Sequence, residues 1–408
     1  MAGQKLLDAK GVDLVRGLTP SLPFKEGALW QTGKNIMFAE QSVQPTPGQG
    51  LLVGKPEVAP VRGMVELMVD KPTLYFATLE NIYRWKLDDP AVEHVAYVTG
   101  GHLHETHEHP ATMWSMINFG RWVIAANGLK KPILSKNTGD FYHLPEWPEG
   151  VKILGKIGPF VLGFGNTADP TEIVWSTDDN PEVVTITPEN KAGYIQARNL
   201  GSGIMAAAPL GEGIAFYGTD AMHYVSMVGY PNWFGQQRLL SGVGVVGLNA
   251  VVSVGRVHYG FSHRGIFRTD GSSVDWNIDT PIHDYVYDNL NREQMSKVTA
   301  WHWKTQGMIA FFYPTKDSLD LSAGVALNYR NGAWTILGFT RTAVTDSSVF
   351  PFPIAGDAAG NLYRQDQEGT IPDGDPASLD LEAAYRVQTG VGSFGVGQGG
   401  VGGWNGEG

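Results

Sequence analysis

Short apolar runs separated by small turns recur along the chain. The four clearest examples cover residues 73–85, 214–225, 257–268 and 353–364. In three of them the second run contains an aliphatic residue, an aromatic residue and then an arginine, at Arg84, Arg268 and Arg364. Apolar runs joined in this way are typical of tight β-hairpins. Four hairpins of one design indicate an internal repeat.

Weaker pairs of apolar runs lie between these hairpins, at residues 121–126, 160–176 and 308–329. Their centres are separated by roughly 40 to 50 residues, which is the spacing of propeller blades, small sheets that bury their faces against their neighbours. Six or seven such units fit the chain. We therefore predict an all-β fold, a β-propeller of about six blades, with a pair of β-sandwich domains as the alternative.

One segment departs from the β pattern. Residues 281–290 and 292–298 carry apolar side chains near helical spacing, which predicts one or two helical turns between blades. The last stretch is rich in glycine and nearly uncharged, so it has little to bury. We predict an N-terminal arm with strands that pack on the propeller (1–60), the propeller itself (61–385) and a flexible C-terminal tail (386–408).

Composition agrees with a packed β protein. Of the 408 residues, 42% are hydrophobic and only 17% are charged, which disfavours disorder and coiled coil, and 52 glycines favour turns over long helices. The formal net charge of −11 disfavours a surface that grips nucleic acid, because such affinity depends on basic groups that neutralise phosphates.

The absence of cysteine excludes disulfides, thiolate nucleophiles and cysteine-based zinc sites. The start of the chain has no apolar core of a signal peptide, and no uncharged apolar run approaches the ~18 residues that cross a bilayer. We expect synthesis in the cytoplasm and no membrane anchor.

Two glycine-containing motifs suggest chemistry that their surroundings do not support. Residues 242–247 match G-x-G-x-x-G, but a β-type run follows where a nucleotide-binding fold needs a helix, so we interpret them as a loop that leads into a blade. Ser202 lies between two glycines but lacks the flanking pattern of a nucleophile elbow.

Four closely spaced histidines form the one cluster with the chemistry of a metal site: His102, His104, His107 and His109. With Glu105 and Glu108 they could converge on Zn or Ni, although the pattern is not H-E-x-x-H and an exposed polar loop explains it without a metal. We expect a loop or hairpin tip that takes up protons below about pH 6.5, with metal binding as the minor hypothesis.

Paired carboxylates and tryptophans offer two further candidates. The pairs Asp178–Asp179 and Asp317–Asp320 occur in turn-like contexts, where aspartate is favoured for backbone hydrogen bonding. Of the 12 tryptophans, which could stack on sugar rings, most lie beside apolar strand residues and are better used in a core, whereas Trp147 and Trp233 lie near prolines and are expected in loops. We expect no catalytic, cofactor-binding or metal-binding residues, and no hydrolase activity.

The order of these motifs resembles a known family, the β-propeller tail proteins of short-tailed bacteriophages, described as tail nozzle, distal tail-tube or packaged-DNA stabilisation proteins. The resemblance extends from Ile173 to Leu337 and rests on the segments 173–182, 213–225, 255–271, 295–300, 309–314 and 327–334. Residues 33–38 and 47–48 resemble the opening of the family. The glycine-rich end departs from it, which puts closure of the propeller by an N-terminal strand in doubt.

The resemblance implies a structural protein of the virion tail with no cofactor and no catalytic residues. It implies a ring, most simply of six copies, at the distal end of the tail, where it encloses the DNA exit channel and contacts a tail adaptor and fibre or needle proteins. The low charge suits subunits that bury their flanks, and the acidic balance suits a wall along which DNA passes without tight binding. The alternatives are a sugar-binding or glycan-cleaving propeller and a tail-tip or adhesin component of a long-tailed phage. We also expect Arg84, Arg268 and Arg364 to pair with backbone or carboxylate groups at blade boundaries.

Overall fold

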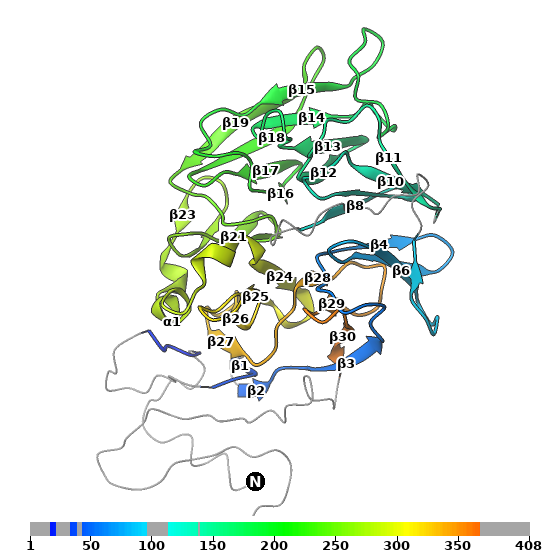
Figure 1. Cartoon of the computed structure of the whole chain (residues 1–408). Helices are drawn as coiled ribbons and strands as arrows, with labels where there is room; N and C mark the ends of the chain where they lie inside the picture. The colour runs from blue at the N-terminus through cyan, green and yellow to red at the C-terminus, as the bar shows by residue number, and fades with distance from the viewer. Residues whose placement is uncertain (1–16, 22–32, 39–42, 96–112, 138, 368–408) are drawn as a thin grey trace, which may run out of the picture.

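The computed structural model describes residues 17–21, 33–38, 43–95, 113–137 and 139–367. Within these residues, seven antiparallel sheets of four strands each follow one another along the chain. Figure 1 shows the sheets arranged around a common centre, from the blue strands near the start to the orange strands near the end. The structure is therefore a seven-bladed β-propeller, and the expected count of about six blades was one too low.

Six blades are built from four consecutive strands. Blades one to three contain β4 (Gly63–Met68), β5 (Pro72–Ala77), β6 (Ile82–Lys86) and β7 (Glu93–His94); β8 (Ser115–Phe119), β9 (Trp122–Ala126), β10 (Ile133–Lys136) and β11 (Phe141–His143); β12 (Ile153–Ile157), β13 (Phe160–Phe164), β14 (Glu172–Trp175) and β15 (Gly193–Gln196). Blades four to six contain β16 (Ala206–Leu210), β17 (Gly213–Tyr217), β18 (Ala221–Gly229) and β19 (Trp233–Ser241); β20 (Val251–Val254), β21 (Val257–Phe261), β22 (Ile266–Thr269) and β23 (Val274–Asp275); β24 (Thr299–Trp303), β25 (Met308–Tyr313), β26 (Ala323–Asn328) and β27 (Trp334–Leu337).

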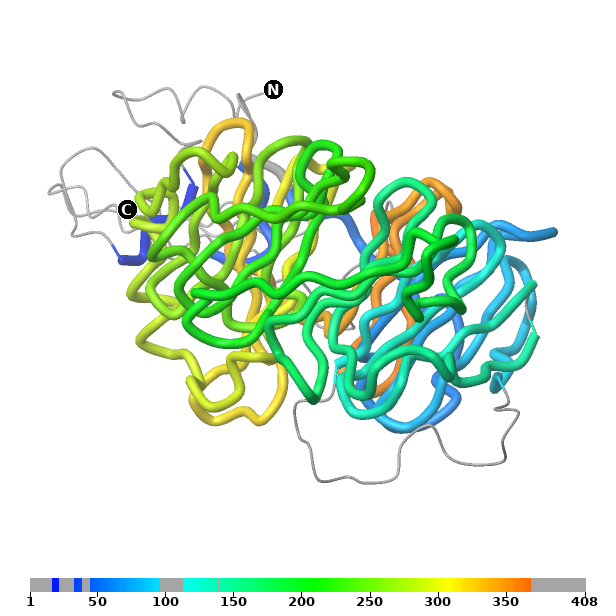
Figure 2. Tube along the Cα trace, turned by 90° about the horizontal axis from the view of Figure 1, so that it is seen from above, coloured from blue at the N-terminus to red at the C-terminus, as the bar shows by residue number. Residues whose placement is uncertain are grey.

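Blade seven closes the ring with strands from both parts of the chain. It contains β28 (Ala343–Thr345), β29 (Ile354–Gly356) and β30 (Leu362–Gln367), and its outermost strand is β3 (Gly48–Val53). Leu51 pairs with Tyr363 and Gly50 with Arg364 in an antiparallel ladder. Figures 1 and 2 both show the blue and orange segments side by side. An N-terminal strand therefore does close the propeller, a point that the sequence left in doubt. This strand belongs to the unit 1–60, which we had expected only to pack on the propeller.

The hydrophobic core is divided between neighbouring blades, because each sheet presents apolar side chains on both faces. Between blades six and seven, the indole rings of Trp301 and Trp303 stack with centroids 4.5 Å apart, and Phe339 packs edge-on against Trp303. Comparable clusters fill the spaces between the other blades. Strands β13, β17 and β25 are buried along their whole length, because each lies inside its sheet and both of its faces are covered.

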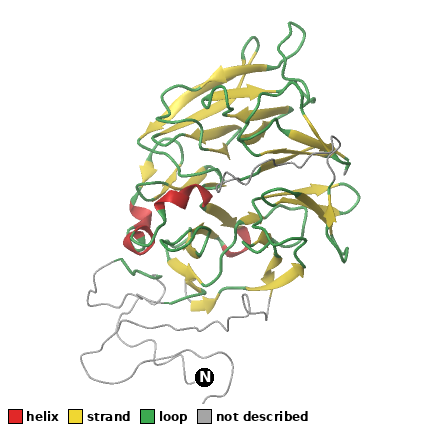
Figure 3. Cartoon of the chain, viewed as in Figure 1, coloured by secondary structure: helices red, strands yellow, loops and turns green. Residues whose placement is uncertain are grey.

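Short helical turns join blades five and six, as predicted: η1 (Asn277–Asp279), α1 (His283–Tyr287) and η2 (Arg292–Lys297). The fourth, η3 (Lys304–Gln306), connects β24 to β25. Figure 3 shows how few red turns interrupt the yellow strands. A small hairpin of β1 (Ile36–Phe38) and β2 (Val43–Pro45) packs against β27 of blade six, where the Asn35 N–H donates to the Ile336 carbonyl at 2.8 Å. The predicted tail, 386–408, lies outside the described residues.

Candidate functional site: the central channel and its mouth

The first strand of every blade borders a central cavity of about 320 Å³. Its lining combines apolar side chains with small polar ones, among them Met64, Trp114, Leu154, Val252 and Ser253. No Asp, Glu, Lys or Arg of the described residues lines this cavity. A B-form duplex, whose major groove alone is about 12 Å wide, does not fit a space of this size. The channel of one propeller is therefore no path for DNA.

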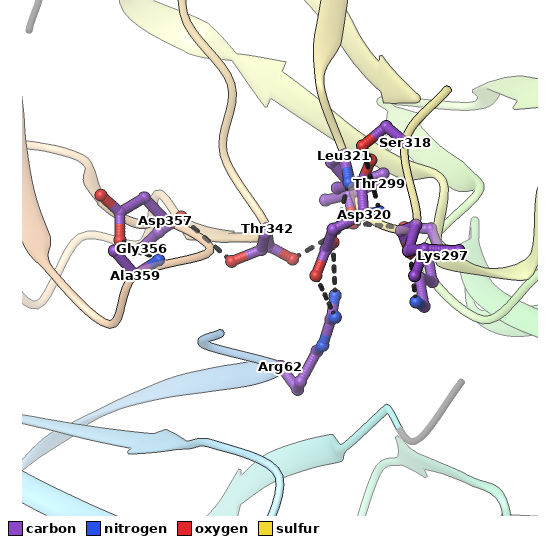
Figure 4. A network of polar contacts seen from close by, with 11 residues as sticks. Arg62, Lys297, Thr299, Ser318, Asp320, Leu321, Thr342, Gly356, Asp357 and Ala359 are labelled. Atoms are coloured by element: carbon purple, nitrogen blue, oxygen red, sulfur yellow. Dashed lines mark hydrogen bonds and ion pairs between the residues drawn. The ribbon is translucent and has the colours of Figure 1, made fainter. Parts of the chain in front are cut away.

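Charged groups gather at one end of the channel, where the chain enters the first strands of blades one and six. Arg62 directly precedes β4 and is 2% exposed. Its guanidinium donates to both carboxylate oxygens of Asp320, at 3.1 and 2.5 Å. Asp320 lies in the turn between β25 and β26, so the pair joins blades one and six, which are not neighbours. Figure 4 shows the Arg62 side chain reaching from the blue ribbon to the yellow turn.

Lys297 adds a second buried cation to this network. It lies two residues before β24, the channel-lining first strand of blade six, is 4% exposed, and donates to the Leu319 carbonyl at 2.5 Å. Burial lowers its pKa, and the like charge of Arg62 lowers it further, whereas Asp320 opposes the shift. The hydroxyl of Thr299 donates to the Thr342 carbonyl at 3.3 Å, which ties blade six to blade seven. Two cations thus depend on one carboxylate.

The three repeat arginines occupy equivalent third strands, β6, β22 and β30. Arg84 pairs with Glu93 at 2.7 Å and Arg268 with Asp275 at 3.2 Å, and each partner lies opposite in the same sheet. Arg364 lies over the ring of Phe352, with its guanidinium carbon 4.4 Å from the centroid. Pairing with carboxylates is confirmed for Arg84 and Arg268. The expected position at blade boundaries was wrong, because each pair joins the third and fourth strands, which are neighbours within one blade.

The candidate carboxylate pairs do not form acid–base pairs. Asp178 binds Lys191 at 2.5 Å, which lowers the pKa of its carboxyl, while Asp179 occupies a turn with φ of 55°. Asp320 binds Arg62, and Asp317 is exposed. Each pair was recognised correctly as a turn sequence. The metal hypothesis for His102, His104, His107 and His109 lies outside the described residues.

The two glycine-containing motifs also lie in turns or loops. Residues 242–247 connect β19 to β20 without a following helix, as interpreted from the sequence, and Gly244 lies so close to Thr219 that a Cβ would meet its carbonyl oxygen at 2.1 Å. Ser202 donates to the Gly203 carbonyl at 2.8 Å and accepts from the Thr219 N–H.

Within the described ranges, no three His, Asp or Glu side chains gather as metal ligands would.

Tryptophan is used mainly in the core, as predicted. Trp85, Trp175, Trp301, Trp303 and Trp334 are buried. Trp147 does lie in a loop but is 1% exposed, and its indole N–H donates to the Pro181 carbonyl at 2.7 Å. Trp233 is not a loop residue but begins β19.

An apolar hairpin tip is a surface feature that the sequence analysis missed. Strands β18 and β19 are nine residues each and end in a turn where Met227 is 43%, Val228 60% and Tyr230 86% exposed. No charged residue occurs between 227 and 237. The unbroken run of uncharged residues around Tyr230 was the signal that could have identified it. Exposed apolar clusters of this kind mark contact surfaces.

The strand order and the closed ring define the class of protein, a seven-bladed β-propeller. No protein-family model matches the sequence, and no curated protein matches it. Among solved structures, virginiamycin B lyase from Staphylococcus aureus is 11% identical with a TM-score of 0.49, and the match covers 78% of this chain and 98% of that one. The computationally designed Ika8 protein is 11% identical (TM-score 0.40; 78% and 99% covered), and a chain of the mitotic checkpoint complex is 12% identical (0.47; 84% and 98%). Similarity at these identities concerns the fold alone.

None of the helices in the described part of the chain is long and apolar enough to cross a membrane.

Proposed function

We propose that this protein is a structural subunit of the virion tail of a short-tailed bacteriophage. Several copies form a ring at the distal end of the tail, and this nozzle encloses the DNA exit channel and helps to retain and release the genome. The proposal keeps the six-copy ring, bound to a tail adaptor and to fibre or needle proteins, as its simplest form. It assigns no enzymatic activity and no cofactor to the chain.

The observation that carries the proposal is the uncharged apolar hairpin tip around Tyr230, because a surface of this kind calls for a protein partner. The segments that resemble the tail family support it, since they fall in order on four consecutive blades. Segment 173–182 begins in β14 of blade three, 213–225 contains β17 and the first half of β18, and 255–271 contains β21 and β22. Segments 295–300, 309–314 and 327–334 lie between η2 and β27 of blade six.

The size of the propeller channel determines where DNA would pass. Because the 320 Å³ cavity cannot hold a duplex, the exit path must lie between copies, along the outer surfaces of the propellers. A subunit with a net charge of −11 offers such a path a wall that repels phosphate.

Location on a particle tests the proposal directly. We expect mass spectrometry of purified virions to detect the chain and immunogold electron microscopy to place it at the distal tail. Absence from virions, or a single copy per particle, would contradict the proposal. Release of reducing sugar from a host polysaccharide by the purified protein would instead favour the glycan-cleaving alternative.

The hairpin tip allows a sharper test of assembly. Replacing Val228 and Tyr230 by serine should reduce incorporation into tails while leaving the melting temperature unchanged, because both side chains are exposed. Leu319→Ser is the matched control, since Leu319 is 75% exposed in a turn of blade six. Equal incorporation of the hairpin variant and the control would show that the tip is no assembly contact.

A further inference from the structure

A second cavity, of about 340 Å³, lies beside the helical turns that join blades five and six. Its lining includes Ser21, Arg264, Trp276, Asp279, His283 and Asp284. The channel network and the hairpin tip do not contribute to it. Its volume is at the lower end of the range found for small-molecule sites, about 300 to 1,000 Å³, and suits a ligand of one ring.

An imidazole in this cavity is held in a fixed orientation. His283 Nδ1 donates to Asp279 Oδ2 at 2.8 Å, and the same oxygen accepts the Ile266 N–H at 2.8 Å. Asp279 is 4% exposed, and the ring of His283 stacks on Tyr287 with centroids 4.7 Å apart. Because Asp279 occupies Nδ1, the other ring nitrogen, Nε2, remains for a ligand, and no described residue bonds to it.

The backbone is adapted to this arrangement at Gly265. A Cβ at this position would lie 2.8 Å from Asp279 Oδ2 and 3.6 Å from the Cε1 of His283. A side chain would therefore push the carboxylate away from the imidazole. The turn between β21 and β22 can deliver the Ile266 N–H to Asp279 only because residue 265 has no side chain.

The guanidinium of Arg264, which donates no hydrogen bond to another described residue, lies in the same cavity. The guanidinium carbon of Arg264 is 4.9 Å from the centroid of the Trp276 ring, which positions the group without consuming its N–H donors. Arg62, Arg84 and Arg268 all bind carboxylates, whereas no Asp or Glu of the described residues pairs with Arg264. A planar guanidinium with free donors is suited to bidentate binding of an oxyanion.

Ser21 supplies a further donor from the N-terminal part of the chain. Its hydroxyl oxygen accepts the Tyr285 N–H at 3.0 Å, and its own N–H donates to the Pro281 carbonyl at 3.1 Å. The hydroxyl hydrogen stays available for a ligand. The charge of Asp279 is engaged by two donors, and Asp284 is exposed, so water screens its repulsion of an anion.

We infer that this cavity binds a small ligand through an oxyanion, a carboxylate or a phosphate, held by the guanidinium of Arg264 and the hydroxyl of Ser21, while Nε2 of His283 accepts a hydrogen bond from a hydroxyl group of the ligand. A sugar acid and a phosphate group share this chemistry. The inference does not depend on ring assembly. If the cavity binds no anion, the proposed function still stands, and if the protein is absent from virions, the inferred ligand site still stands.

Titration of the full-length protein with glucuronate, inorganic phosphate and glucose tests the site. The readout is the ¹H–¹³C signal of the His283 ring, assigned by its loss in His283→Gln, together with calorimetric affinity. We expect glucuronate or phosphate to shift this signal and neutral glucose to leave it in place. A response to glucuronate alone identifies a sugar acid as the ligand class, and a response to phosphate alone identifies a phosphate group.

Variants separate recognition by charge from nonspecific effects. Arg264→Gln should weaken binding about tenfold or more, since the substitution removes the charge-assisted hydrogen bonds to the oxyanion. Asp284→Asn should change the affinity little, because water screens this exposed carboxylate, and Arg256→Gln, in the neighbouring turn of the same blade, should have no effect. The inference is wrong if neither anion shifts the His283 signal, if glucose shifts it equally, or if Arg256→Gln weakens binding as much as Arg264→Gln.

Discussion

Arg62 and Asp320 are 258 positions apart in the sequence, yet they form a bidentate ion pair at the mouth of the channel. Arg62 and Lys297 are both nearly inaccessible to water, so the carboxylate of Asp320 compensates two buried cations. A buried charge that loses its partner keeps its desolvation penalty. Removing the Asp320 carboxylate alone should therefore lower the free energy of unfolding.

We expect Asp320→Asn to lower the free energy of unfolding by about 3 kcal/mol, measured by urea denaturation. Asp317→Asn is the matched control, because Asp317 is exposed in the same turn, and it should change the free energy of unfolding by less than about 0.5 kcal/mol. Equal effects of the two substitutions would mean that the ion pair does not compensate the buried cations.

The Lys136–Glu182 pair gives a residue-scale prediction that depends on pH. Lys136 Nζ lies 2.5 Å from Glu182, and the Tyr142 hydroxyl donates to the same carboxylate at 3.0 Å, so a loop of blade three is tied to blade two. The hydrogen bond from Lys136 holds the pKa of Glu182 below its usual value. A carboxyl with a lowered folded-state pKa stabilises the protein above its unfolded pKa, about 4.3, and loses this contribution as the pH falls.

Glu182→Gln should therefore lower the free energy of unfolding by about 0.5 to 1 kcal/mol at neutral pH, a small value because both side chains are about one-third exposed. The difference from wild type should shrink when thermal unfolding is repeated at about pH 3. Asp140→Asn, an exposed neighbour of the same blade, serves as the control. A difference that persists unchanged in acid would contradict the electrostatic explanation.

At the scale of elements, the hairpins of the sequence analysis correspond to the second and third strands of the blades. These strands are the most buried, so β5 and β6 or β25 and β26 produce strong apolar runs. Outer strands give weak signals, since β7 and β23 have two residues each. The four hairpins and the three weaker pairs each correspond to one blade, so these patterns number seven, and the prediction of about six blades was lower than the number of patterns.

The candidate sites were harder to predict than the blades, for a physical reason. Sequence spacing constrains neighbours within a hairpin, so the pairing of Arg84 and Arg268 with carboxylates could be expected. It does not constrain Arg62 with Asp320, or Ser21 with His283, because these residues are far apart in the sequence and meet only in the folded propeller.

Arg341 supports the closing strand and offers a test at the scale of elements. It is 1% exposed, donates to the Gln49 side chain of β3, and lies over the ring of Tyr363 in β30 at 4.2 Å. Arg341→Leu should increase hydrogen exchange in β3 and β30 more than in β17, because the guanidinium holds these two strands of blade seven together. The control is Arg330→Leu, at an exposed position. Faster exchange throughout the molecule would indicate general destabilisation instead.

At the scale of the whole molecule, the charge balance predicts weak interaction with DNA. With 41 acidic and 30 basic residues, the subunit has no net attraction for phosphate. In fluorescence anisotropy with a labelled duplex, we expect no measurable affinity at about 150 mM salt and almost no dependence on salt concentration. A basic protein of similar size verifies that the assay detects binding. Tight binding with a steep salt dependence would require a basic surface and would contradict a passive exit channel.

The position of β3 also has a consequence for biosynthesis. Its partner β30 is translated about 300 residues later, which takes about 15 to 60 s at ribosomal rates of 5 to 20 residues per second. During that interval the nascent chain carries an unpaired strand edge, which is a template for intermolecular pairing. Crowded polysomes should therefore favour aggregation of unfinished chains, and a chaperone that shields this edge would raise the yield without changing the final structure.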